Sequence, residues 1–156
     1  MDEVDTAILA ALQDDARRTN KEIAQSLGIA PSTCHERTRS LVRRGVIRGF
    51  RAEVDLPALN RGVQALVSVQ IRPLHRSVID GFQDFASGRP EILSSYVLAG
   101  ADDFVLHVAV QDLDHLHAFL VDRLSKRKEV AGFRTSVVYR QARATAVTAL
   151  EAPGGG

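Results

Sequence analysis

The chain has 156 residues, of which 45% are hydrophobic and 25% are charged, a composition typical of one globular domain or two small ones. This length excludes a large multidomain enzyme. The formal net charge of +1 provides no overall attraction to a polyanion, so a nucleic-acid contact would require local clustering of basic side chains.

The single cysteine, Cys34, cannot form an intrachain disulfide, and the sequence therefore does not call for an oxidising compartment. The first residues are acidic where a secretory signal would be basic. No apolar run approaches the ~18 residues that span a bilayer. We therefore expect a cytoplasmic protein with no membrane partner.

Helical periodicity predicts three helices before residue 45. The first has its apolar side at Val4, Ile8, Leu9 and Leu12. Thr19 and Glu22 have the spacing of a capping box, which predicts the start of a second helix. Gly28 suits the left-handed residue that ends this helix, and Pro31 suits the first turn of the third, which we expect to reach Arg44.

The third helix has one apolar and one polar face. A 100° step places Cys34, Thr38 and Leu41 on the core side. The opposite face is wholly polar, with Ser32, Glu36, Arg39 and Arg43 at its centre and Thr33, His35 and Ser40 beside them. Residues 45–50 then predict a turn into a short strand and residues 52–55 its return, which together would form a hairpin or wing.

Two helices joined by a short turn, the second with an exposed polar face, form the helix-turn-helix pattern. The charge pattern strengthens this interpretation, because residues 37–51 contain no acid and the arginines Arg37, Arg39, Arg43, Arg44, Arg48 and Arg51. The planar fork of arginine matches phosphates and guanine edges. We predict a surface for double-stranded DNA, in preference to an ordinary solvated arginine-rich helix.

Position along the third helix suggests separate roles for its side chains. Those early enough to reach bases are Ser32, Thr33, His35, Glu36 and Arg39, and those better placed for phosphates are Arg43, Arg44 and Arg48. Arg37 lies nearer the buried face, where an ion pair with Glu22 and a phosphate contact remain equally open. Cys34 is predicted to be a small buried hydrophobe without chemistry.

The second half changes to alternation with a period of two, typical of strands. Strands are predicted at 63–71, 92–99, 103–110 and 133–141, with helices around 78–86 and 112–124. This strand-helix-strand-strand-helix-strand order predicts a ferredoxin-like βαββαβ domain with both helices on one face of an antiparallel sheet. The other face, which includes Val105 and Ala109, is predicted to associate with a second copy.

The predicted fold class is therefore α+β, with an N-terminal winged helix-turn-helix followed by the ferredoxin-like domain. Its expected boundaries are a DNA-binding domain at 1–50, a linker strand at 51–62, a domain for effector binding and oligomerisation at 63–141, and a tail at 142–156 whose end is disordered.

Few residues of the second half indicate chemistry. In the turn at Gly100, the adjacent carboxylates of Asp102 and Asp103 suit either a ligand ammonium group or solvent, and the residues alone favour solvent. His115 and His117 diverge by about 200° on a helix, which argues against a metal site. There is no glycine-rich phosphate loop and no nucleophile elbow. We expect no catalytic residue, no metal and no cofactor.

Taken together, residues 2–141 closely resemble the Lrp/AsnC family of feast/famine transcriptional regulators. The matching motifs are Asp5-x-x-Ile8-Leu9-x-x-Leu12, Arg17, Glu22-Ile23-Ala24, Leu27-Gly28-Ile29, Ser32-Thr33, Arg37, Leu41, Gly45-Val46-Ile47, Gly49-Phe50 and Gly100-x-x-Asp103-Phe104. The resemblance implies a sequence-specific regulator of amino-acid or nitrogen metabolism genes. It also implies homodimers that assemble into tetramers, octamers or larger rings.

The resemblance further implies a small-molecule effector, commonly an amino acid, bound near the turn formed by Gly100, Ala101, Asp102 and Asp103. Ala99 stands where many members of the family have Thr. Two alternatives stay open. The sirohaem decarboxylases also look like this family, and such an enzyme would use cofactor-facing residues for which His107 and Arg140 are the nearest candidates. The other alternative is a ligand sensor that acts through protein partners.

Overall fold

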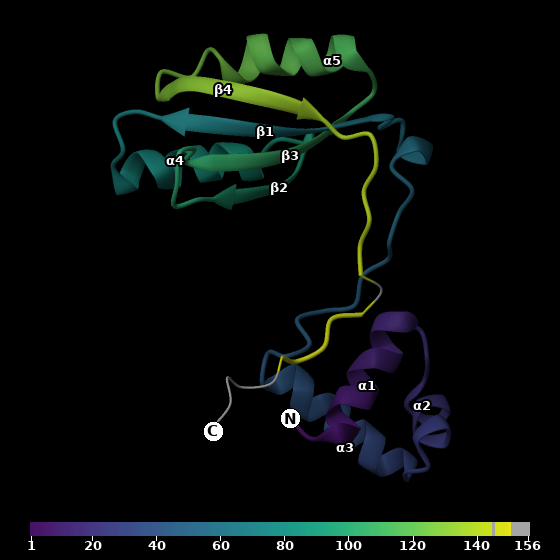
Figure 1. Ribbon diagram of the computed structural model, residues 1–156. Coiled ribbons are helices and arrows are strands. Elements are labelled where there is room, and N and C mark those ends of the chain that lie inside the picture. Colours follow the sequence, from purple (N-terminus) through teal and green to yellow (C-terminus); the bar gives the residue numbers. More distant parts are fainter. Residues whose placement is uncertain (145, 151–156) are drawn as a thin grey trace. The chain divides into compact units, whose positions relative to one another are not determined.

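A computed structural model of the chain describes residues 1–144 and 146–150, and it divides into two compact units (Figure 1). One unit contains Met1–Glu53 with the described residues from Ala142 onward, and the other contains Val54–Gln141. Each unit has its own hydrophobic core. Within the described residues, no helix is both long and apolar enough to span a bilayer.

The first unit contains α1 (Glu3–Asp14), α2 (Asn20–Leu27) and α3 (Pro31–Arg43). The predicted capping box is confirmed at α2, where the Thr19 N–H donates to Glu22 Oε2 over 2.7 Å and the Glu22 N–H donates to Thr19 Oγ1 over 3.2 Å. Gly28 ends α2 with φ of +66°. The three helices enclose a core of fully buried Ile8, Ile23, Ala24, Cys34 and Leu41.

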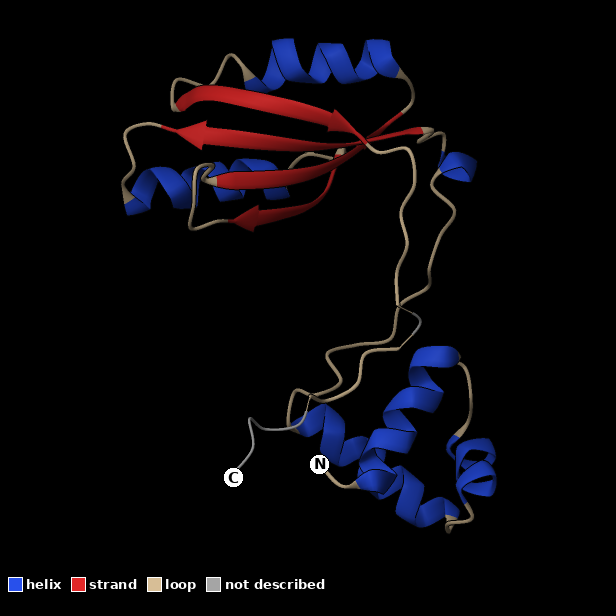
Figure 2. Ribbon diagram, viewed as in Figure 1, coloured by secondary structure: helices blue, strands red, loops and turns tan. Residues whose placement is uncertain are grey.

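Residues 45–55 form no strand, and Figure 2 shows this segment as loop. Gly45 turns the chain with φ of +71°, after which the Val46 and Ile47 N–H groups both donate to the Leu41 carbonyl oxygen. Val46 and Phe50 stay exposed, so a hairpin here would have no apolar face to bury, and an isolated two-stranded hairpin is marginal in water. The predicted pairing of the wing's strands is therefore wrong, while the helix-turn-helix is confirmed.

The second unit has the predicted βαββαβ order (Figure 2). A short 3₁₀ turn, η1 (Pro57–Leu59), precedes β1 (Val63–Ile71), and α4 (Arg76–Ser87), β2 (Ile92–Val97) and β3 (Phe104–Val110) follow. The helix α5 (Leu113–Ala118) continues as the π-helical segment η2 (Phe119–Leu124), and β4 (Val130–Val137) closes the sheet. The strands lie in the order β2-β3-β1-β4, and all pairs are antiparallel.

One face of this sheet forms the core with the helices. The alternate residues Ala65, Val67, Val69 and Ile71 of β1 and Phe104, Leu106, Val108 and Val110 of β3 are buried in one cluster with Phe82, Ala86, Leu116, Phe119 and Leu124 of the helical segments. The Phe82 and Phe104 ring centroids lie 4.7 Å apart. The cluster confirms that α4 and α5 cover the same face of the sheet.

The last strand lies earlier in the chain than the predicted 133–141. A register shift between Gln70 and Ile71 allows Ile71 to pair with Val130, so β4 starts three residues before Phe133. At its other end the strand finishes at Val137, whose partner is Ala65. The alternation of residues therefore predicted the strand but not the bulge that sets its limits.

Candidate nucleic-acid interface and effector turn

The polar face of α3 is held outward by its attachment to α2. The Thr38 hydroxyl, half-buried at the junction, is within hydrogen-bond distance of Asn20 Oδ1 at 3.2 Å and of the Cys34 carbonyl oxygen at 2.9 Å. His35 Nδ1 lies 3.2 Å from the Asn20 side-chain nitrogen. The side chains predicted to reach bases, Ser32, Thr33, His35, Glu36 and Arg39, are all exposed. The structure brings them together on one surface.

Four of the six arginines in residues 37–51 are exposed and make no ion pair with any described residue: Arg39, Arg43, Arg48 and Arg51. They extend from the middle of α3 into the loop after it. Cations in this state keep their full positive charge available to a polyanion, because no internal acid neutralises them. Local charge here thus matters more than the net charge of the chain.

The other two arginines contact an acid in α1. Arg44 Nη1 lies 3.5 Å from Asp5 Oδ2, and Arg37 Nη1 lies 3.1 Å from Asp5 Oδ1. Arg37 also pairs with Asp2. Glu22, which the sequence left open as one of two alternative partners for Arg37, instead accepts hydrogen bonds from Thr19, so Arg37 pairs with other acids than the one considered.

These contacts shift the protonation equilibria of the residues involved. The Asp5 backbone N–H and the Arg37 guanidinium both bond to the Asp2 carboxylate and hold its pKa below the usual range. Hydrogen bonds to the carboxylates of Asp2 and Asp5 raise the pKa of Arg37, and Asp2 makes the larger contribution. Sequence reasoning missed Asp2 and Asp5, because more than 30 residues separate them from Arg37 and no local spacing links them.

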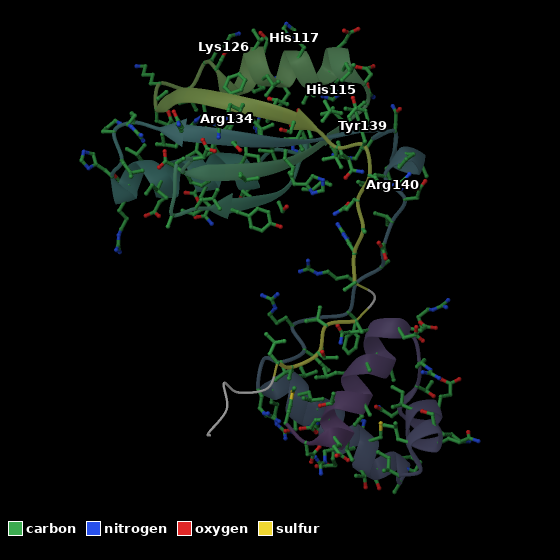
Figure 3. All side chains as sticks on the ribbon, in the orientation of Figure 1. His115, His117, Lys126, Arg134, Tyr139 and Arg140 are labelled. Atoms are coloured by element: carbon green, nitrogen blue, oxygen red, sulfur yellow. The ribbon has the colours of Figure 1, made fainter. Side chains whose placement is uncertain are left out.

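At the turn between β2 and β3, Asp103 has partners within the protein. Its Oδ2 accepts a hydrogen bond from the Ile71 N–H over 2.7 Å and another from Arg72 Nη1 over 3.1 Å. Asp102 pairs with Arg134, which Figure 3 shows on β4. Both carboxylates are therefore paired within the protein, contrary to the hydrated turn that the residues alone favoured.

The remaining residues of this turn are accessible. Gly100 and Ala101 are exposed, and the Ala101 carbonyl oxygen accepts a hydrogen bond from Gln70 Nε2 over 3.2 Å. Sequence reasoning missed Gln70, Arg72 and Arg134 as neighbours of the turn. Only the pairing of β1 with β3 and β4 places these side chains next to it.

The two histidines of α5 have different surroundings (Figure 3). Asp112 caps the helix by accepting the His115 N–H over 2.8 Å, and His115 Nε2 lies 3.9 Å from Glu91 Oε1, whereas His117 is exposed. Among the described residues, no group of three His, Cys, Asp or Glu side chains could hold a metal ion. His107 of β3 lies 2.8 Å from Gln64 Oε1.

Comparison with known proteins supports both units. Residues 1–48 match the model of winged helix-turn-helix DNA-binding domains, and residues 64–147 match that of the Lrp/AsnC ligand binding domain. The transcriptional regulator AldR of Mycolicibacterium smegmatis is 44% identical over 143 residues, which are 92% of this chain and 84% of that protein. The transcriptional regulator AzlB of Bacillus subtilis is 34% identical over 138 residues, 88% of each chain.

Solved structures agree with the sequence relatives. The crystal structure of MtbAldR has a TM-score of 0.69 at 39% identity, and the match covers 94% of this chain and 99% of the MtbAldR chain. A transcriptional regulator from Neisseria meningitidis in complex with L-Met has a TM-score of 0.87 at 27% identity and covers 96% of both chains. The protein therefore belongs to the Lrp/AsnC family and is a transcriptional regulator that combines a DNA-binding helix-turn-helix with a ligand-binding domain.

Proposed function

We propose that this regulator recognises a specific duplex DNA sequence through the exposed face of α3 and responds to an amino acid or a related small molecule. Its targets would be genes of amino-acid or nitrogen metabolism. One observation carries the proposal: four exposed arginines without internal partners lie on α3 and the loop after it, next to a wholly polar helix face. Such a surface suits phosphates and base edges at once.

Within this surface we assign separate tasks to the two parts of α3. The residues proposed to contact base edges are Ser32, Thr33, His35, Glu36 and Arg39, near the start and middle of the helix. Arg43 at its end, and Arg44 and Arg48 in the segment that follows it, would contact phosphates. Arg37 has the sequence position of a further phosphate contact, but it pairs with Asp2 and Asp5.

A titration of fluorescence anisotropy tests DNA binding, with labelled duplex from the chain's own promoter region and a scrambled duplex as the comparison. Each lost phosphate contact should reduce the slope of log K against log salt by about 0.9. Arg43→Gln should therefore flatten the salt dependence, and Arg123→Gln, an exposed arginine of η2 in the other unit, should leave it unchanged. Absence of salt-dependent binding to any duplex would contradict the proposal.

For the effector, we propose the turn formed by Gly100, Ala101, Asp102 and Asp103. Support comes from the Neisseria meningitidis regulator, whose structure contains L-Met. Asp103 is engaged by the Ile71 backbone, whereas Asp102 has an arginine partner whose side chain is 70% exposed. Asp102 is therefore the carboxylate more able to exchange its partner for a ligand ammonium group.

A thermal-shift screen of the amino acids tests this assignment. The expected result is a rise in melting temperature with one amino acid or a few related ones, which Asp102→Asn reduces and Asp122→Asn, an exposed acid of η2, leaves intact. A full response in Asp102→Asn would contradict the role of this residue. A Soret band in the purified protein would instead indicate the enzyme alternative that involves His107 and Arg140.

For assembly, we propose a homodimer that pairs the sheet face opposite the helices and then forms a tetramer, octamer or larger ring. Leu66 and Tyr96 on the strands of this face are 42% and 56% exposed, and exposed apolar side chains on a sheet favour association. Analytical ultracentrifugation should show an oligomer at micromolar concentration. A monomer at that concentration would contradict the proposal.

A further inference from the structure

A buried carboxylate lies behind the arginine-rich surface. Asp5, on the first turn of α1, is 5% exposed, although Glu3 of the same turn and Arg44 are exposed. One of its oxygens lies 3.1 Å from Arg37 Nη1 and the other lies 3.5 Å from Arg44 Nη1. A single internal acid thus contacts two of the six arginines in residues 37–51.

We propose that Asp5 is a positioning residue of the DNA interface. It commits Arg37 to the protein and restrains Arg44 at the end of α3, so that α3 is presented to DNA in one orientation. Under this proposal, which rests on the proposed function, Arg37 is not a DNA contact.

The geometry around Arg37 supports its commitment. The same Nη1 atom contacts both Asp5 and Asp2, and Asp2 in turn accepts the Asp5 N–H as the cap of α1. This network joins the first turn of α1 to the middle of α3. Moving Arg37 to a phosphate would leave the Asp5 carboxylate buried without its closer cation, which is strongly unfavourable.

Arg44 is held less tightly. Its contact with Asp5 is longer, no other ion pair to it is present among the described residues, and 48% of its side chain is exposed. It can therefore approach a phosphate while Arg37 continues to neutralise Asp5. The six arginines accordingly fall into three groups: Arg37 is committed, Arg44 is shared, and the other four are free.

The first test compares Arg37→Gln with Arg43→Gln in the full chain. When the salt concentration is raised from 50 to 200 mM, the affinity for DNA should fall by about 3.5-fold for each phosphate contact. Arg43→Gln should therefore lose affinity less steeply over this range, by one such factor for each lost contact, and its melting temperature should be unchanged. Arg37→Gln should lower the melting temperature and leave the salt dependence as in the wild type.

The opposite pattern would overturn the proposal: Arg37→Gln flattens the salt dependence as much as Arg43→Gln does, at an unchanged melting temperature. If Arg37→Gln does not fold, Arg37→Lys provides the same comparison. Lysine keeps the charge but replaces the guanidinium, whose Nη1 reaches both Asp2 and Asp5, with a compact ammonium on a different stem, so the melting temperature should fall and the salt dependence should hold. An unchanged melting temperature in this variant would equally refute the proposal.

A second test addresses positioning itself. Asp5→Asn keeps the size of the side chain and removes the charge that restrains both arginines. The released arginines should then strengthen binding to scrambled duplex and lower the affinity ratio between specific and scrambled DNA. Arg37→Gln added to Asp5→Asn should recover part of that ratio.

A purely structural Asp5 would give another result, in which the affinities for both duplexes fall by the same factor and their ratio is unchanged. That outcome would refute positioning even where DNA binding is real. Failure of the wild-type chain to bind any duplex would refute the proposed function itself, so the two failures are distinguishable.

Discussion

The Asp103 carboxylate offers a direct test of how the turn between β2 and β3 is built. Its oxygen accepts the Ile71 N–H over 2.7 Å at the last residue of β1, where the Ile71 residue is fully buried. The side chain of Asp103 is itself only 13% exposed. Asp103→Ala would leave the Ile71 N–H without its acceptor and Arg72 without its acid.

The magnitude follows from these two losses. A hydrogen bond to a charged group contributes about 1.5–3 kcal/mol, and the Arg72 pair, with an arginine side chain that is 58% exposed, adds less than about 1 kcal/mol. We therefore expect a loss of about 2–3 kcal/mol in the free energy of unfolding. In a domain of 60–100 residues this corresponds to a drop of about 10–20 °C in melting temperature.

Differential scanning calorimetry of the full chain without effector provides the measurement. Asp102→Asn is the matched control, because it changes the adjacent acid and loses only an ion pair with an exposed arginine. Asp103→Asn keeps an acceptor for the Ile71 N–H and should fall between the two. A melting temperature of Asp103→Ala within about 2 °C of the wild type would refute the reasoning, since 2 °C corresponds to well under 1 kcal/mol.

Three further changes test other parts of the structure. Thr19→Ala removes the cap of α2 and should cost about 1 kcal/mol in urea unfolding, a loss that Thr19→Ser should largely avoid. Phe82→Ala opens a cavity against Phe104 and should cost about 3–5 kcal/mol by the same measurement. The pKa values of Asp2 and Glu22 are lowered in the fold. Their contribution to stability is therefore complete above their pKa values in the unfolded chain and is lost as the pH falls through the lowered pKa values of the folded state. Helical circular dichroism should therefore hold at pH 6 and decline below about pH 4.

Where a signal is local, the sequence predicted the structure. The Thr19 and Glu22 spacing located the start of α2, and Gly28 located its end, because a capping box and a left-handed residue act within one helical turn. Alternation located β1 and β3, since every second residue of each is buried against the helices. The order of elements then sufficed for the ferredoxin-like class.

Features that depend on distant neighbours were not predicted. The buried partner of Arg37, Asp5, is more than 30 residues away in α1, whereas the sequence offered only Glu22 or a phosphate as alternatives. Likewise, the partners of Asp103 lie at the end of β1, next to it only after the strands pair. Residues 45–55 carry turn and strand formers, but their side chains find no apolar surface to cover, and the wing's strands do not pair.

The count of arginines shows why these distant contacts matter for function. If all six arginines contacted phosphates, the salt slope would be near −5.4 for each chain, and the five that remain when Arg37 is committed to Asp5 predict about −4.5. Over the fourfold range from 50 to 200 mM salt, that difference is about 3.5-fold in affinity. Neither the net charge of +1 nor the count of six arginines in residues 37–51 predicts this difference in salt dependence. The difference depends on Asp5, one buried acid that determines which cations remain available to DNA.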